Sequence, residues 1–134
     1  MRVILDANVI IAAAASRGLC EAILELCLEH HHLILCEGIL EEIEEKLRIK
    51  IKVSPPVIAE YVKILRNNAQ ILEPEEVERA ICRDPDDLMI LGLVVPGNVD
   101  AIITGDKDLL VIKEYKNARI MTPRNFWESN RKEK

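Results

Sequence analysis

Short apolar runs alternate with longer amphipathic stretches along the chain. The short runs are bounded by polar residues, which is typical of buried strands; they lie at residues 2–6, 33–36, 69–74, 100–104 and 118–122. The longer stretches have helical periodicity and lie at residues 8–32, 37–50, 54–68, 84–95, 106–115 and 123–130. Strands that alternate with helices favour parallel pairing with crossover helices on both faces. The pattern therefore predicts a three-layer α/β/α sandwich with a mainly parallel central sheet.

Turn and capping residues locate several helix ends. Ser16 and Gly18 indicate a break inside the first helical stretch. Ser54 before two prolines, and Asp84 before Pro85, are typical of helix starts. The chain has 134 residues, the length of one ordinary domain. We expect a single domain over residues 1–130 and a frayed tail at residues 131–134.

Composition narrows the classes of function. Hydrophobic residues make up 49% of the chain and aromatic residues only 3%, so the core must be aliphatic and few side chains can stack on bases. The net charge of −5 argues against a general nucleic-acid coating protein, which would be basic. The four cysteines lack C-x-x-C spacing, and we expect reduced core thiols in a cytoplasmic protein.

The first apolar segment superficially resembles a signal peptide. Asp6 and Asn8 interrupt it, and its positive region is a single arginine, so we expect a strand and a turn instead. No stretch reaches the roughly 18 apolar residues of a membrane span. We therefore predict no membrane association.

Acidic residues follow the predicted strands or precede the next helix. Asp6 ends the first strand, Asp106 and Asp108 follow the strand at residues 100–104, and a helix starts with Asp84, Asp86 and Asp87. In an open parallel sheet the loops at the carboxyl ends of the strands meet and form the site. Carboxylates that converge there repel one another unless some hold protons or a divalent cation neutralises them. Oxygen ligands favour Mg²⁺ or Mn²⁺, which suits a metal-dependent nuclease.

Each acid also has a structural explanation. Asp84 fits a helix N-cap, Asp87 would stabilise a helix dipole, and Asp106 would cap the next helix with Asp108 in its first turn. On the helix at residues 37–50, periodicity puts several glutamates on the flanks or the outer face and does not single out Glu42. The pattern alone leaves these alternatives open.

Four segments in order resemble the PIN domain family, especially its small prokaryotic members that are toxin components of toxin–antitoxin pairs. The segments are VILDANVII, EEIEEKL, RDPDDLMILGLVV and DAIITGDKDLL, and they span nearly the whole chain. The resemblance implies an α/β/α fold and an endoribonuclease site that depends on Mg²⁺ or Mn²⁺. It also implies an RNA substrate, an antitoxin protein as partner and a homodimer.

The resemblance also implies specific site residues. Glu42 is selected by a family-like spacing that falls here at Cys36, Glu42 and Leu47, although relatives commonly carry Ser at the first of these positions. The implied catalytic and metal-binding acids are Asp6, Glu42, Asp87 and Asp106, with Asp108 as an additional metal ligand and with Asn8 and Thr104 as supporting residues. As a hypothesis, Asp6, Asp87 and Asp106 anchor one ion, and Glu42 and Asp108 complete a weaker second site.

Basic residues alternate with apolar ones at residues 45–53, a strand-like period at the end of a predicted helix. These residues would form a stripe along an RNA backbone, with a solvated surface as the equal alternative; they are Lys46, Arg48, Lys50 and Lys52.

Two other functions compete with the nuclease. An Asp-based phosphatase commonly needs a second Asp two residues after Asp6, where this chain has Asn8. A non-catalytic RNA-binding or scaffolding protein with the same fold is expected to lose one or more acids, and none is missing here.

Overall fold

The computed structural model describes residues 1–132 and contains a six-stranded sheet in the order β3-β2-β1-β4-β6-β5. All neighbouring strands pair in parallel except β5 and β6, which are antiparallel. The strands are β1 (Arg2–Leu5), β2 (His32–Leu35), β3 (Ala69–Ile71), β4 (Ala101–Ile103), β5 (Glu114–Tyr115) and β6 (Ala118–Met121). The mainly parallel sheet confirms the predicted fold class.

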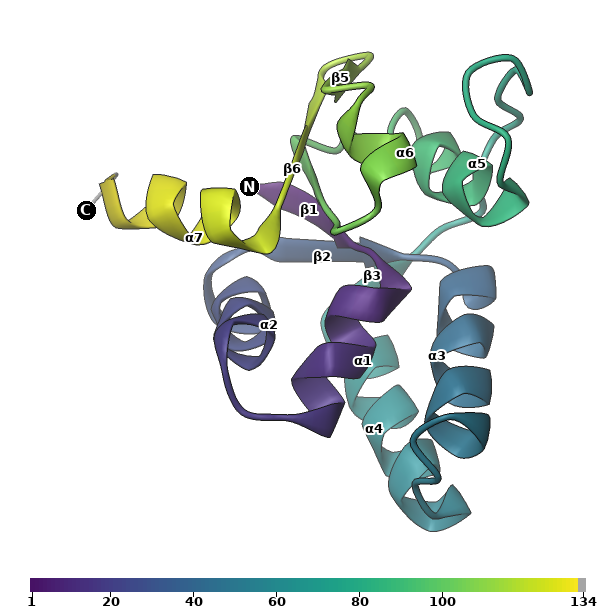
Figure 1. The fold of residues 1–134 in the computed structure, drawn as a ribbon, viewed down its shortest axis with the longest axis vertical. Helices are drawn as coiled ribbons and strands as arrows, with labels where there is room; N and C mark the ends of the chain where they lie inside the picture. The colour runs from purple at the N-terminus through teal and green to yellow at the C-terminus, as the bar shows by residue number, and fades with distance from the viewer. Residues whose placement is uncertain (133–134) are drawn as a thin grey trace.

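Helices cover both faces of this sheet, which gives the three layers visible in Figure 1. The first four helices lie on one face, α5 and α6 lie on the other, and α7 packs against α2. The helices are α1 (Ala7–Ala15), α2 (Leu19–His30), α3 (Glu37–Ile49), α4 (Pro55–Asn68), α5 (Pro85–Gly92), α6 (Lys107–Leu110) and α7 (Pro123–Lys132).

Strands β1 and β4 form the centre of the sheet and the point where the chain reverses its direction of strand addition. After β1 the chain adds β2 and β3 on one side, then returns to add β4 and β6 on the other. Leu5 pairs with Ile103, and the Asp6 N–H donates to the Ile103 carbonyl at 3.0 Å. The residues that follow these two strands, Asp6 and Thr104, are therefore neighbours. Such a switch point is where open α/β sheets form their sites.

The core is aliphatic, as the composition predicts. The strand residues from Val3 to Leu5 and from Leu33 to Leu35 are buried, and Phe126 is the one aromatic residue among the largest fully buried side chains. Cys27, Cys36 and Cys82 are buried free thiols, and Cys20 is partly buried. The compact aliphatic interior provides a rigid support for the loops at the carboxyl edge of the sheet.

The structure settles one ambiguous pattern, and one predicted element is wrong in detail. The alternating stretch at residues 45–53 forms no strand, because α3 continues to Ile49 and keeps Leu47 on the buried face with Ile43. The helix predicted at residues 106–115 stops at Leu110, and Glu114–Tyr115 instead forms the short strand β5. Val111 is 73% exposed and Lys113 has a φ of 68°, so the apolar spacing there does not mark a buried helical face.

Two further expectations, the frayed tail and the lack of a membrane span, can be compared with the structure only within residues 1–132. Helix α7 extends to Lys132, so the tail predicted at residues 131–134 begins inside it, and residues 133–134 lie outside the described part of the chain. Within residues 1–132 no helix is long and apolar enough to cross a bilayer.

Candidate metal centre

Asp6 is a buried carboxylate at the start of α1. It is the N-cap of that helix, and its Oδ1 accepts the Asn8 N–H at 3.4 Å. Its other oxygen, Oδ2, accepts a hydrogen bond from Thr104 Oγ1 at 2.6 Å. Asp6 is only 6% exposed and Thr104 is fully buried. A buried charge needs such partners, and they fix the direction in which Asp6 points.

Thr104 connects the ends of β1 and β4. Its hydroxyl donates to Asp6 and accepts the Asp106 N–H at 3.0 Å. One hydroxyl therefore positions Asp6, which follows β1, and Asp106, which follows β4. The predicted supporting role of Thr104 remains a prediction, but its contacts are those that the role requires.

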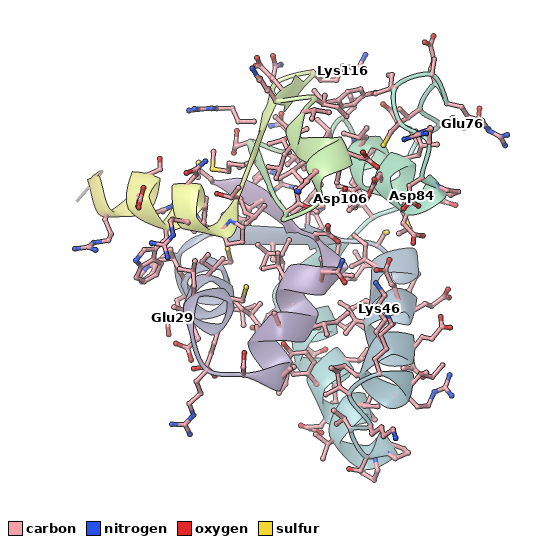
Figure 2. The ribbon with its side chains drawn as sticks, in the orientation of Figure 1. Glu29, Lys46, Glu76, Asp84, Asp106 and Lys116 are labelled. Atoms are coloured by element: carbon pink, nitrogen blue, oxygen red, sulfur yellow. The ribbon has the colours of Figure 1, made fainter. Side chains whose placement is uncertain are left out.

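Three aspartates from two separate segments come together above this edge. We call Asp84, Asp87 and Asp106 the aspartate cluster. Each residue offers a carboxylate oxygen, and these oxygens lie within 4.8 Å of one another. Figure 2 shows Asp84 and Asp106 on facing segments at the starts of α5 and α6.

The capping explanations for these acids are also correct. Asp84 accepts the Asp86 N–H at 2.9 Å and caps α5, and Asp106 accepts the Asp108 N–H at 2.9 Å and caps α6. Capping orients each side chain, because the accepting oxygen is fixed by the backbone of its own helix. Capping and convergence are thus compatible in this fold.

Asp87 is the most perturbed acid of the cluster. Burial, followed by the hydrogen bond and negative charge of Asp106, raises the pKa of Asp87 to about 7. The charge of Asp84 acts in the same direction, whereas a hydrogen bond from Cys82 Sγ at 3.5 Å favours the ionised form. With Asp87 only 3% exposed, a proton on this carboxyl relieves the repulsion near neutral pH.

Glu42 lies on α3 and is neutralised in a different way. We call Asn8, Glu42 and Lys46 the lysine-bridged cluster. Lys46 Nζ donates to Glu42 Oε2 at 2.9 Å and to Asn8 Oδ1 at 3.1 Å, which links α3 to the first turn of α1. Burial raises the pKa of Glu42, and the charges of Asp86 and Asp6 add to this, while Lys46 opposes them. Glu42 therefore faces the same acidic region.

The remaining predicted residues lie outside these two clusters. Asp108 is exposed and lies beyond the close group of carboxylates. Arg48, Lys50 and Lys52 are exposed at and beyond the end of α3, and Lys46 alone of the proposed stripe contacts the acidic region. At 100° per residue, positions two apart on a helix diverge, so these side chains do not form one straight row. RNA contact by this group remains a prediction.

Asp84 and Cys82 were not assigned to the site from the sequence, and Lys46 was predicted to contact RNA but not to bond Glu42. Asp84 was assigned to capping, although its place in the DPDD segment put it beside the other converging acids. Lys46 lies four residues after Glu42, a spacing that brings two side chains together on a helix. Cys82 had no comparable signal, because it lies in the irregular segment before α5.

The donor set of the aspartate cluster fits a hard divalent cation. All three candidate ligands are carboxylate oxygens, which suit Mg²⁺ and Mn²⁺ better than softer metals. Among residues 1–132, no Lys or Arg forms an ion pair with Asp84, Asp87 or Asp106. The negative charge of the aspartate cluster is therefore not paired with a basic side chain of the described residues, and a bound cation would neutralise it.

Comparisons with known proteins agree with this fold. The structure is similar to a chain in the crystal structure of VapBC2 from Rickettsia felis bound to a DNA fragment from its promoter, with a TM-score of 0.60 and 15% sequence identity. The similarity covers 91% of this chain and 98% of the other. No curated protein sequence matches this chain. A PIN domain family model matches residues 2–108, so the chain belongs to the PIN domain family.

Proposed function

We propose that this protein is a ribonuclease that cleaves RNA phosphodiester bonds with Mg²⁺ or Mn²⁺ held by its acidic residues. The main support is the aspartate cluster, whose three carboxylates come from separate segments and have oxygens within 4.8 Å. Membership of the PIN domain family agrees with a nuclease function. Asp6, Glu42, Asp87 and Asp106 are the proposed catalytic and metal-binding acids, and the cluster geometry adds Asp84.

Each side chain has a distinct part in this proposal. A divalent ion, when bound, opposes the charge of a phosphodiester and lowers the pKa of a water molecule. Asp87 and Asp106 present their oxygens to the ion, with Asp84 beside them. Asp6 is held by Thr104, whose hydroxyl also accepts the Asp106 N–H, so its carboxylate keeps a fixed orientation beside the segment that carries Asp106. Such preorganisation means that little rearrangement is needed when charge develops.

An RNA cleavage assay with and without Mn²⁺ tests this proposal. We expect wild-type protein to cleave in Mn²⁺ or Mg²⁺ and to stop when EDTA is added. Asp6→Asn, shown by circular dichroism to be folded, should lose cleavage, because the neutral amide is a poorer ligand and Asn still caps α1.

The matched control is Glu45→Gln, since Glu45 is exposed on α3 and makes no described ion pair. Intact cleavage by folded Asp6→Asn would reject the assignment. Release of phosphate from a small phosphoester without RNA cleavage would support an Asp-based phosphatase instead. Mn²⁺ binding with neither activity would support a non-catalytic RNA-binding protein.

We further propose that the protein acts as the toxin component of a pair and that its antitoxin binds a groove between α3 and α4. Similarity to a chain from a VapBC2 structure supports a protein partner of this kind. The groove has a volume of about 360 Å³ and an apolar floor that includes Ile58 and Val62. Arg48, Lys63 and Arg66 lie around it together with one acid, Glu44, and Arg66 is paired with Glu37. Arg48 and Lys63 therefore suit an amphipathic segment with acidic side chains.

Co-expression with the product of an adjacent small reading frame tests this partner. Wild-type protein should co-purify with that product, and charge reversal by Lys63→Glu should weaken the complex at low salt. An unchanged complex in Lys63→Glu would argue that the partner binds elsewhere. Absence of any complex would remove the toxin assignment but not the nuclease.

A further inference from the structure

A cation of the protein itself lies inside the acidic region. The Lys46 ammonium is bonded to Glu42 Oε2 and to Asn8 Oδ1, at 2.9 and 3.1 Å. Asp6 and Asp86 are also close enough for their charges to act on Lys46. Figure 2 shows Lys46 on α3, beside the start of α1 and below the labelled aspartates. Lys46 thus lies where the proposed second, weaker metal site would need a positive charge.

The local structure holds Lys46 in this position. Its neighbours Ile43 and Leu47 are buried on the inner face of α3, which packs against α1 and α4, and they fix the rotation of the helix. Helix α3 packs against α1, which carries Asn8, so the two hydrogen bonds join packed elements. The Lys46 side chain is 29% exposed and the Glu42 side chain 17%, so the ion pair is shielded but still reaches solvent.

The bonding capacity of Lys46 is not exhausted. A lysine ammonium has three N–H donors, and Lys46 uses one for Glu42 and one for Asn8. One donor therefore remains for a ligand oxygen at the partly open side. A metal ion at Glu42 would compete with Lys46 for the same carboxylate, so the two cations exclude each other.

We propose that Lys46 is the second cation of this site, so that the protein binds one divalent ion and uses Lys46 to contact the RNA phosphate. The ion is held by the aspartate cluster. Glu42, named above among the proposed metal-binding acids, instead bonds Lys46, which occupies the position of a second ion. Its remaining N–H donates to a non-bridging phosphate oxygen and opposes the charge that develops there. This inference rests on the proposed ribonuclease function.

Calorimetric titration with Mn²⁺, combined with RNA cleavage kinetics, tests the proposal. Wild-type protein should bind one Mn²⁺ per chain. Lys46→Met keeps most of the length of the side chain but removes the ammonium, so Glu42 and Asn8 become free to bind a second, weaker Mn²⁺. Cleavage by this variant should fall about 100-fold in kcat/KM, the loss typical of removing one charge-stabilising donor.

Two further variants separate the role of the charge from effects on folding. Lys46→Arg retains a cation and should keep a stoichiometry of one and most of the activity. Lys113→Met is the control, because Lys113 is an exposed lysine between α6 and β5 and belongs to neither cluster. It should behave as wild type in both measurements. If Lys46→Met does not fold, the stoichiometry of wild type and of Lys46→Arg still decides the question.

The outcomes separate this proposal from the ribonuclease assignment. Two Mn²⁺ per wild-type chain, or an unchanged stoichiometry and kcat/KM in Lys46→Met, would overturn the role of Lys46 and leave the ribonuclease intact. One Mn²⁺ in wild type, two in Lys46→Met and no cleavage by either would reject the ribonuclease but retain Lys46 as a built-in cation.

Discussion

The aspartate cluster and the lysine-bridged cluster lie beside each other, but the charge of their acids is neutralised differently. In the lysine-bridged cluster Glu42 has a hydrogen-bonded cation, because Lys46 lies 2.9 Å from it. In the aspartate cluster the described protein supplies no cation, and burial with the neighbouring acids raises the pKa of Asp87 to about 7. One cluster has its counter-charge built in, and the other holds a proton until a cation replaces it.

This difference indicates that the lysine-bridged cluster is complete in the protein alone, whereas the aspartate cluster is left for a ligand. Among described residues, the polar side-chain atoms that are fully buried all have hydrogen-bond partners, so no unsatisfied buried polar group adds to the repulsion between the acids. The repulsion that remains is concentrated at Asp84, Asp87 and Asp106. Binding a dication there removes an unfavourable interaction as well as adding a favourable one. Four predictions sharpen this comparison.

The largest effect is expected from neutralising the aspartate cluster. Asp106→Asn keeps a good helix N-cap, but it removes one candidate ligand, so cleavage should fall on the order of 100- to 1000-fold. The same variant should raise the free energy of unfolding of the metal-free protein by about 1–3 kcal/mol, because it removes a repulsive charge beside Asp87. Kinetics and urea unfolding in EDTA measure both effects. Glu45→Gln is the control, and equal cleavage by the two variants would contradict the assignment.

A smaller effect is expected at the residue that connects the two strands. Thr104→Val keeps the shape but removes the hydroxyl that bonds Asp6 and the Asp106 N–H. Loss of these bonds should cost about 1–3 kcal/mol of stability and reduce cleavage about 10- to 100-fold. Thr104→Ser restores the hydroxyl and should recover most of the activity. If Thr104→Val cleaves as well as Thr104→Ser, the hydroxyl does not position the acids.

The third effect is a pH dependence that belongs only to the aspartate cluster. The pKa of Asp87 rises from its ordinary value of 3.8 to about 7 on folding. Between these values the unfolded chain has lost the proton and the folded chain retains it, so metal-free stability should fall as pH rises from about 4 to about 7. Mn²⁺ requires the ionised carboxylate, so its affinity should rise about tenfold between pH 6 and pH 8 and then level off. Asp87→Asn should abolish the rise of Mn²⁺ affinity with pH. A wild-type Mn²⁺ affinity that does not change between pH 6 and pH 8 would contradict the assignment to Asp87.

The smallest effect concerns the thiol beside Asp87. The Cys82 Sγ–H donates to Asp87 Oδ2 at 3.5 Å and favours the ionised carboxylate. Cys82→Ala should therefore raise the pKa of Asp87 further and move the pH midpoint of Mn²⁺ affinity upward by a few tenths of a unit. Cys27→Ala is the control, because Cys27 is also buried but lies on α2. A downward shift of this midpoint in Cys82→Ala would mean that the Cys82 hydrogen bond raises the pKa of Asp87 and does not lower it.

Much of the fold followed from hydrophobic periodicity, because the buried faces are long and aliphatic. Predictions were wrong where an element was too short or its pattern ambiguous. Strand β5 has only two residues, Glu114 and Tyr115, and its existence depends on pairing with β6. The alternation at residues 45–53 arises where an amphipathic helix ends and exposes Ile49 and Ile51.

The candidate site was predictable where topology decides it. Asp106 after β4 converges with acids that start α5, and Asp6 after β1 is linked to Asp106 through Thr104, because parallel strands bring their carboxyl ends to one edge. Two features depend on side-chain geometry that no linear pattern contains. Asp84 both caps α5 and joins the cluster, and Lys46 reaches across to Asn8 on another helix. Periodicity likewise could not select Glu42, whose orientation depends on how α3 rotates against α1.

The most direct test of the central claim is a crystal structure of wild-type protein soaked in Mn²⁺, examined by anomalous scattering. We predict one peak per chain within coordination distance of Asp87 and Asp106, and no peak between Glu42 and Lys46. The absence of manganese from the aspartate cluster at millimolar Mn²⁺, in crystals that leave this edge open to solvent, would contradict the account.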